Sequence, residues 1–228
     1  IAARCFARFS RSLDGIDRSE LAIVIPDFHN PRKRWAQFEE ALTRDPLGRS
    51  KDCGADIDFA MSRAQDVVSW QALLGELPER VCHNDCKINN LLVSRSSGDP
   101  LAIIDLDTCM PGRVMTDFGD LVRTCCSPEV EDSTRLDAVH ARPEVYRALL
   151  EGYLDGWSGE LTTAERESLL LGGPMMSFVV GLRFLTDHVD GDRYFATSRK
   201  NHNLDRARNQ FQLYRSLADQ QSHFAGTV

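Results

Sequence analysis

Two short apolar runs interrupt a chain whose other segments follow a helical period. The runs are Leu91–Val93 and Leu101–Ile104, and the turn-forming segment Ser96–Pro100 lies between them. Short runs joined by serine, glycine and proline are typical of a β-hairpin with a long loop. Apolar residues recur at helical spacing before this hairpin and again after Asp117. The pattern therefore predicts an α+β fold that is mainly α, with one small β-hairpin embedded in a helical lobe.

The helices can be placed by their apolar spacing and by the prolines that end them. Before the hairpin, Trp35, Phe38 and Leu42 form one apolar stripe, and a second helix is expected over about 56–74. After the hairpin we expect helices over 118–126, 144–157, 163–171, 174–189 and 204–218. The segment 25–31 cannot be helical, because each of its prolines pushes the preceding residue out of the α region.

Composition limits the classes of function. The 228 residues carry 34 acidic and 27 basic side chains, a formal net charge of −7, with no long run of either sign. This balance argues against a nucleic-acid partner and fits an acidic enzyme of small metabolites. No stretch approaches the roughly 18 uninterrupted apolar residues that cross a bilayer. We therefore expect no membrane partner and a cytoplasmic protein.

The seven cysteines are odd in number, and two of them, Cys125 and Cys126, are adjacent. In a chain of this size they indicate reduced thiols rather than a disulfide framework. Cys82, His83 and Cys86 lie close enough in the sequence to raise zinc as an alternative. No second ligand pair with the spacing of a zinc finger or zinc ribbon is present, so the sequence disfavours zinc.

One loop is crowded with polar and ionisable side chains directly before the first apolar run. It is the segment 81–90, with the sequence VCHNDCKINN, and the second run leads into Asp105 and Asp107. If the hairpin forms, Asn90 and Asp105 lie at neighbouring points on adjacent strands and can share one cation. Phosphoryl transfer needs an oriented nucleophile, an acceptor for its proton, and Mg²⁺ held on oxygen ligands. A His-x-Asp-x-x-x-x-Asn loop followed by a strand-end aspartate supplies each of these parts.

In this order and spacing, the two motifs resemble the catalytic loop and metal-binding motif of the aminoglycoside phosphotransferase and choline kinase superfamily, a relative of the protein kinases. The resemblance implies a protein-kinase-like C-terminal lobe that uses ATP and Mg²⁺. It implies that Asp85 accepts the proton of the substrate hydroxyl and that Asn90 and Asp105 bind Mg²⁺. Through the metal, Asn90 and Asp105 would also help to bind the nucleotide, and Asp107 is a possible second ligand of the metal.

The same resemblance gives roles to two more loop residues. His83 would orient the loop, and Lys87 would place its charge on the transferring phosphate, where it also helps to bind the nucleotide. The alternative is that Asp85 and Lys87 are an ordinary exposed ion pair. The presence of Asn90 and Asp105 favours the catalytic interpretation.

Asp117, Phe118 and Gly119 match by letters the metal-binding triplet of protein kinases. Asp117 lies 32 residues after Asp85 and directly before a helical pattern, which favours a helix-capping role. In the superfamily, an aspartate that follows the metal-binding strand supports the catalytic loop. Asp117 fits that role, so we assign the metal to Asp105 instead.

Further segments resemble the N-acetylhexosamine 1-kinases, which phosphorylate the anomeric hydroxyl of N-acetylglucosamine or N-acetylgalactosamine. The segments are PDFHN (26–30), DPLGR (45–49), HND (83–85), IDLDT (104–108), MPG (110–112), GLRFLTD (181–187) and NLDRAR (203–208). The resemblance extends from residue 1 to about 216 and places a sugar-binding arginine and tyrosine at Arg183 and Tyr194. Choline, homoserine or an aminoglycoside are alternative acceptors.

Arg183 also lies in a strongly apolar segment, where a buried guanidinium needs a partner. A substrate would be one partner, and an i,i+4 pair with Asp187 or a helix position facing water is the alternative. Tyr194 taken alone would be a packed aromatic residue. Arg206 and Arg208 are expected on a solvated helix face.

The chain begins at Ile1 with apolar residues already at helical spacing. It shows neither a nucleotide-covering glycine loop nor a strand lysine before the catalytic loop, two parts that kinases of this kind carry. We therefore expect residues 1–228 to form a single catalytic lobe, a fragment of a longer chain with the N-terminal nucleotide lobe absent. A second hypothesis is an inactive truncated lobe that folds and binds a partner without turnover.

Overall fold

The computed structural model describes residues 1–224. Its α-helices are α1 (Ala2–Ser12), α2 (Pro31–Arg44), α3 (Gly54–Met61), α4 (Ala64–Glu76), α5 (Val114–Cys125), α6 (Pro143–Trp157), α7 (Thr163–Val189), α8 (His202–Asp219) and α9 (Gln221–Phe224). Its strands are β1 (Arg80–Cys82), β2 (Leu91–Val93), β3 (Pro100–Ile103) and β4 (Met110–Gly112). The protein is mainly helical with small antiparallel sheets, which is compatible with the predicted α+β class.

The strands form two separate antiparallel pairs. The predicted hairpin is present as β2 and β3, with Leu91 opposite Ile103. The second pair, β1 with β4, was not predicted, and it sets Arg80 opposite Gly112. Three-residue strands are too short to give a recognisable alternation in the sequence. This second pair matters for function, because the polar loop 83–90 leaves β1 at its end.

The prediction of two separate helices, one ending at Leu171 and the next beginning at Pro174, is wrong, because α7 spans both. It is continuous, with Pro174 inside it, and a capping box at Thr162 and Glu165 begins it. The glycines around the proline serve packing, because α5 crosses α7 at this point. A Cβ atom on Gly119 of α5 would overlap the backbone of Gly172. The two helix backbones are therefore in direct contact, which fixes α5 on the central helix.

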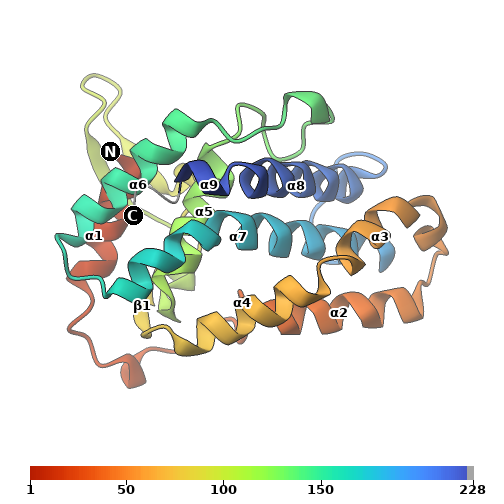
Figure 1. Ribbon diagram of the computed structural model, residues 1–228, viewed down its shortest axis with the longest axis horizontal. Coiled ribbons are helices and arrows are strands. Elements are labelled where there is room, and N and C mark those ends of the chain that lie inside the picture. The colour runs from red at the N-terminus through yellow and green to blue at the C-terminus, as the bar shows by residue number, and fades with distance from the viewer. Residues whose placement is uncertain (225–228) are drawn as a thin grey trace.

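Helix α7 is central in the fold and contacts α2, α5 and α8, and the helices enclose two hydrophobic clusters (Figure 1). One group, α1, α5 and α6, encloses a hydrophobic cluster that includes Phe6, Phe118 and Trp157. The other, α2, α4, α7 and α8, encloses a cluster that includes Trp70 and Phe178. The helices expected over 144–157 and 204–218 are confirmed as α6 and α8.

The helix expected over 56–74 is divided instead into α3 and α4. The Ser62 hydroxyl donates to the carbonyl of Phe59 at 2.7 Å where α3 ends. Such a local side-chain bond competes with helix continuation. The segment 25–31 is not helical, as predicted, and Asn30 caps the start of α2.

Arg206 and Arg208 of α8 are less solvated than predicted, because both are only partly exposed. Arg208 is half-buried and donates to the Asp56 carboxylate of α3, with Nε 3.0 Å and Nη2 2.9 Å from Oδ2. The Arg206 guanidinium lies 5.4 Å from the centre of the Phe184 ring and donates to the carbonyl of Ala196. Both side chains join α8 to neighbouring segments, because that face of the helix is covered.

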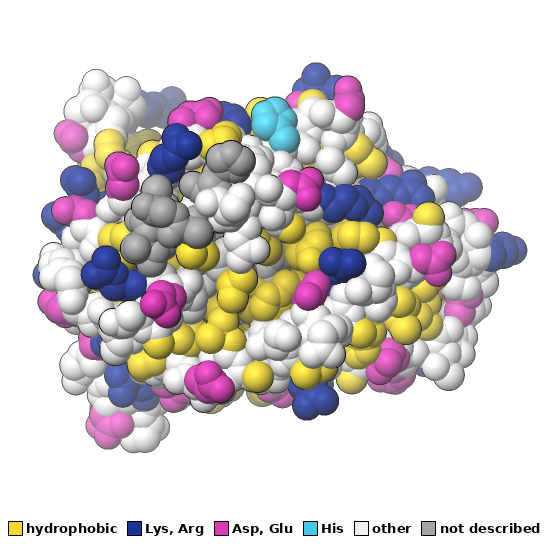
Figure 2. Space-filling model, in the orientation of Figure 1, with side chains coloured by type: hydrophobic (Ala, Val, Ile, Leu, Met, Phe, Trp, Pro, Cys, Tyr) yellow, Lys and Arg dark blue, Asp and Glu magenta, His cyan; other side chains and the backbone are white. Residues whose placement is uncertain are grey.

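By length and composition alone, α7 could cross a membrane, with a mean hydropathy of 1.6 over its most apolar window. The sequence predicted no membrane span, because no stretch approaches the roughly 18 uninterrupted apolar residues that cross a bilayer. In the fold, 78% of that window is buried, as in the core helix of a globular domain. Figure 2 shows apolar side chains exposed in a band along the middle of one face, between α4 and α8.

Candidate active site

The polar loop begins at the end of β1 and is anchored on α5. Asp117, in the first turn of α5, accepts the backbone N–H of His83 through Oδ2 at 2.9 Å and that of Asn84 through Oδ1 at 2.8 Å. Burial raises the pKa of this carboxyl group, and the two backbone donors oppose that shift. The capping interpretation is wrong, because Arg113 occupies the N-cap position of α5. Asp117 instead holds the start of the loop.

Asn84 is fixed in a left-handed backbone conformation, with φ of 62°. Its side-chain amide donates to three carbonyl groups, those of Cys82, Thr108 and Met110, at 3.0–3.1 Å. Asparagine tolerates this conformation better than most residues, because its short polar side chain can bond to nearby backbone. The bonds tie the loop to the segment that leads into β4.

The carboxylate of Asp85 is the centre of the loop. Its Oδ2 accepts hydrogen bonds from Lys87 Nζ at 2.6 Å and from Asn90 Nδ2 at 3.0 Å. The Asn90 amide also donates to the backbone carbonyl of Asp85 at 2.9 Å. About a quarter of the Asp85 side chain, 23%, is exposed, so the carboxylate is accessible from one side.

The hairpin brings Asp105 beside this group. Ile104 donates its backbone N–H to the carbonyl of Asn90 at 3.0 Å, so Asp105 follows directly after that contact. Lys87 Nζ lies 3.8 Å from Asp105 Oδ2. Burial alone would lower the pKa of Lys87, but the bond to Asp85 and the charges of both aspartates outweigh it and raise the pKa. The structure therefore brings the carboxylates of Asp85 and Asp105 to one ammonium group, that of Lys87, and Asn90 joins them through Asp85.

His83 connects the loop to the end of the hairpin. Its Nε2 lies 3.0 Å from the carbonyl oxygen of Ile104, and its Nδ1 accepts the backbone N–H of Asp85 at 3.3 Å. The ring is fully buried against the edge of Phe6. Its predicted orienting role has this geometric basis. Asp107 is exposed, and no hydrogen bond or ion pair joins its side chain to the others within residues 1–224.

Within the described residues there is no group of three or more His, Cys, Asp or Glu side chains arranged to hold a metal ion. Burial raises the pKa of the Cys82 and Cys86 thiols well above the ordinary value. A metal ion would have to displace the proton from either thiol, since a ligand must be a thiolate.

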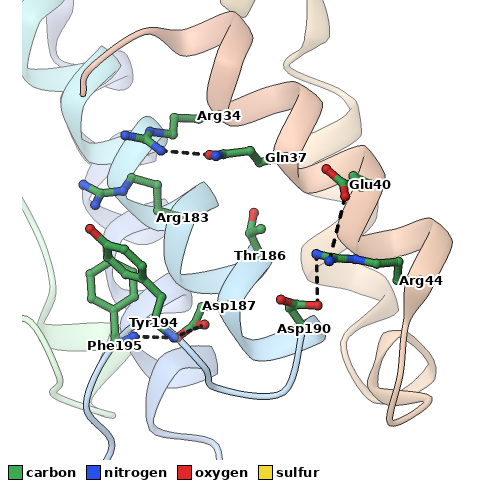
Figure 3. Close-up of a pocket in the computed structure, with 10 residues that line it drawn as sticks. All are labelled: Arg34, Gln37, Glu40, Arg44, Arg183, Thr186, Asp187, Asp190, Tyr194 and Phe195. Atoms are coloured by element: carbon green, nitrogen blue, oxygen red, sulfur yellow. Dashed lines mark hydrogen bonds and ion pairs between the residues drawn. The ribbon is translucent and has the colours of Figure 1, made fainter. Parts of the chain in front are cut away.

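A pocket of about 310 Å³ lies between α2, the end of α7 and the segment 190–195 (Figure 3). Both predicted substrate residues, Arg183 and Tyr194, line it. At its far end Arg44 pairs with Asp190 at 3.1 Å, and Glu40 lies 3.8 Å from the same arginine. The charges at that end are thus largely balanced.

At the near end, the charge of Arg183 is not balanced by any carboxylate in residues 1–224. Its guanidinium lies 5.2 Å from the ring centre of Phe28, 5.7 Å from that of Tyr194 and 5.3 Å from that of Phe195. Burial, followed by repulsion from Arg34, lowers the pKa of Arg183 to about 10. Figure 3 shows the two guanidinium groups close together on the same wall.

The alternative pairing of Arg183 with Asp187 is wrong. Asp187 accepts the backbone N–H groups of 193, 194 and 195 at 2.8–2.9 Å, and a side-chain amide from Asn203 at 2.9 Å. It therefore shapes the segment that carries Tyr194, whose side chain is 69% exposed. The alternative in which Tyr194 is a packed aromatic residue is therefore wrong.

Comparison with protein families gives a match to the phosphotransferase enzyme family (APH) over residues 3–163, well over half of the chain. The chain belongs to this phosphotransferase family. The matched region contains the polar loop 83–90, both strand pairs and α5. Arg183 and Tyr194 lie beyond it. The family match therefore supports a phosphotransferase role for the loop, which it covers, more directly than a substrate role for the pocket residues Arg183 and Tyr194, which lie outside it.

Sequence reasoning missed two residues that join the pocket to the phosphotransferase loop. His29 Nε2 lies 2.7 Å from the backbone carbonyl oxygen of Asn84. Arg34 donates to the carbonyl of Phe28 from Nε at 3.2 Å and from Nη2 at 2.8 Å. The only available signal was the motif PDFHN at 26–30, which indicated a resemblance but gave no contact.

Proposed function

We propose that this phosphotransferase moves the γ-phosphoryl group of ATP to a hydroxyl group of a small molecule, with Asp85 as the general base. The observation that supports this most is the contact of Lys87 and Asn90 with the partly exposed Asp85 carboxylate, with Asp105 on the other side of the same lysine. Phosphoryl transfer depends on positioning and on charge compensation rather than on a covalent enzyme intermediate. This loop supplies a proton acceptor and a cation together.

The donor set fits Mg²⁺. Asn90 uses its amide nitrogen toward Asp85, and its amide oxygen accepts no hydrogen bond within residues 1–224. Asp105 offers a half-exposed carboxylate on the adjacent strand end, and Asp107 is a further candidate two residues later. Oxygen atoms of this kind are the ligands that Mg²⁺ prefers. When bound, the ion would neutralise charge on the triphosphate.

In the proposed reaction, Asp85 accepts the proton of the acceptor hydroxyl as the new oxygen–phosphorus bond forms. The bond between the γ-phosphorus and its bridging oxygen breaks, and ADP leaves. Lys87 carries a charge close to the same carboxylate, so it can stabilise negative charge on the transferring group. His83 and Asp117 hold the loop in place.

For the acceptor we propose a sugar, an N-acetylhexosamine phosphorylated at its anomeric hydroxyl. The resemblance of the motifs supports this choice, and so does the wall formed by Arg183 and Tyr194. A guanidinium donates in a rigid fork, and hydroxyl and amide oxygens accept such bonds. The repulsion between Arg34 and Arg183 disfavours cationic acceptors such as choline or an aminoglycoside, since a third positive charge would add to it.

The test is ADP release by the full-length protein with ATP and Mg²⁺, against N-acetylglucosamine, N-acetylgalactosamine, glucose, choline, homoserine and kanamycin. We expect turnover with the two N-acetylhexosamines and none after chelation of the metal. Asp85→Asn should lower kcat by about two to four decades, the range for loss of a general base. Asp99→Asn, in the exposed turn between β2 and β3, is the matched control. Preferred turnover of a cationic acceptor would refute the sugar assignment, and near-normal kcat in Asp85→Asn would refute the base.

A further inference from the structure

The peptide bond between Asn84 and Asp85 lies between two imidazole rings. Its carbonyl oxygen lies 2.7 Å from Nε2 of His29, and its N–H donates to Nδ1 of His83 at 3.3 Å. One ring comes from the segment before α2 and the other from the loop itself. The orientation of the peptide that presents Asp85 is thus held from both sides.

The partners fix the tautomer of both rings. A carbonyl oxygen only accepts, so Nε2 of His29 must carry a proton toward Asn84, and Nε2 of His83 must carry one toward Ile104. Nδ1 of His83 is then free to accept from Asp85. Burial lowers the pKa of His29 to about 4, so the ring is neutral near pH 7. Both histidines therefore act as fixed hydrogen-bond groups.

The position of His29 is set by a local turn and not by the catalytic loop. Asp27 has a left-handed conformation with φ of 56°, and its carboxylate accepts from the Asn30 amide at 3.0 Å. Asn30 also accepts the backbone N–H of Lys33 and so caps α2. The imidazole is consequently rigid with respect to the helix that forms one wall of the pocket.

The same segment contacts the pocket on its other side. The Phe28 ring lies under the guanidinium of Arg183, and the Phe28 carbonyl accepts two hydrogen bonds from Arg34. The rings of Phe28 and His29 are 4.3 Å apart between centres. A continuous set of contacts therefore runs from the pocket wall to the peptide before Asp85.

We infer that His29 is a positioning residue, which fixes the Asn84–Asp85 peptide against the α2 wall of the pocket and so aligns the Asp85 carboxylate with the acceptor. The inference rests on the proposed function in one respect, the role of Asp85 as base. His29 lies outside the loop, and its contacts would keep the distance between the pocket and the Asp85 carboxylate constant. A displacement of about 1 Å in such an alignment can cost roughly a hundredfold in rate.

A simple packing role makes a different prediction. If the ring of His29 only fills space beside Phe28, then any loss would follow thermal stability and not hydrogen bonding. His29→Gln and His29→Leu separate the two roles. The amide nitrogen of glutamine can occupy the place of Nε2 and donate, whereas leucine fills similar volume without a donor.

The experiment measures kcat, both KM values and Tm for the two variants of the full-length protein, with His140→Leu as the control. His140 is exposed, and within the described part of the chain the one hydrogen bond of its ring is to the nearby carbonyl of Ala138. We expect His29→Leu to lower kcat by about ten- to a hundredfold at an unchanged KM for ATP, and His29→Gln to recover most of that loss. Equal kcat in the two variants, whether low or normal, would overturn the inference.

A second measurement does not depend on turnover. Hydrogen exchange of the Asp85 amide should be faster in His29→Leu than in wild type, and slower again in His29→Gln, because the peptide is held only when the donor is present. Nitrogen NMR of the wild type should show the proton on Nε2 of His29 at pH 7. If wild type shows no turnover but the exchange follows this order, the proposed function fails and the role of His29 in fixing the Asn84–Asp85 peptide is retained. Unchanged exchange in His29→Leu would refute that role.

Discussion

The carboxylate of Asp117 lies 2.8 Å from the backbone nitrogen of Asn84, although 33 residues separate them in the chain. A second oxygen of the same group accepts the N–H of His83 at 2.9 Å. Both contacts are buried, so neither backbone donor has water as a substitute. One side chain of α5 therefore determines where the catalytic loop begins.

Asp117→Asn should destabilise the protein and reduce its activity together. Asparagine has one acceptor oxygen, so one buried backbone N–H would face an NH₂ group, and leaving such a donor unpaired costs about 1–3 kcal/mol. Urea unfolding should show a loss of this size. The exposed Asp137→Asn should show none, and an unchanged free energy of unfolding in Asp117→Asn would contradict the anchoring role.

Asp105→Ala should weaken the binding of Mg-ATP to the full-length protein by at least about tenfold, because it removes an oxygen ligand from the metal. The fold should be retained, since the side chain is half-exposed and lies at a strand end. Calorimetric titration with Mg-ATP measures the effect. Asp99→Ala provides the control, and equal affinity in the two variants would exclude Asp105 as a ligand.

Arg183→Met should raise the KM for the acceptor strongly and leave the KM for ATP nearly unchanged. Methionine keeps much of the volume but removes a buried charge that no carboxylate within residues 1–224 pairs with and that Arg34 repels. Burying an unpaired charge is costly, and removing that cost offsets the loss of the contacts with the three aromatic rings. We therefore expect an equal or higher Tm. A lower Tm with an unaltered acceptor KM would show that Arg183 is structural.

Gly119→Ala should destabilise the protein by several kcal/mol, because its Cβ would overlap the backbone of Gly172 and neither helix can move freely. Gly75→Ala is the matched control, since Gly75 also lies in a helix, α4, and nothing lies within 4 Å of the added atom. Alanine at an exposed helical site gains about 0.5–1 kcal/mol over glycine. Thermal unfolding should therefore move in opposite directions in the two variants.

The His29 ring should make stability depend on pH. Its pKa is lowered to about 4 in the folded protein, so between pH 6.5 and 4 the unfolded chain binds the proton more readily. Stability is then fully present above pH 6.5 and is lost as the pH falls toward 4. Between pH 7.5 and 4.5, wild type should lose about 1–3 kcal/mol more than His29→Gln. An identical pH dependence of urea unfolding in both proteins would contradict this.

The grouping of the proposed catalytic residues could be predicted because its members are close in the sequence. His83, Asp85, Lys87 and Asn90 share one loop, and a single hairpin brings Asp105 to it. Residue type and spacing are sufficient for such a local arrangement.

The remaining features depend on contacts that no local pattern reveals. His29 reaches Asn84 across 55 residues, through a backbone carbonyl that leaves no mark on the sequence. The continuity of α7 through Pro174 depends on its packing against α5, which overrides the usual rule for proline. The i,i+4 spacing of Arg183 and Asp187 suggested an ion pair, but the Asp187 carboxylate instead accepts hydrogen bonds from the backbone N–H groups of 193–195.

That use of Asp187 has a consequence for how the pocket can select its ligand. Three successive backbone N–H groups, those of 193, 194 and 195, already donate to its carboxylate. These N–H groups are therefore not available to a ligand, so a hydrogen bond donated from this part of the wall has to come from a side chain. The choice of acceptor at this wall should depend on the aromatic faces of Tyr194 and Phe195 and on the Tyr194 hydroxyl group. Substitution of these two side chains should therefore change which acceptor is preferred without a change in the backbone.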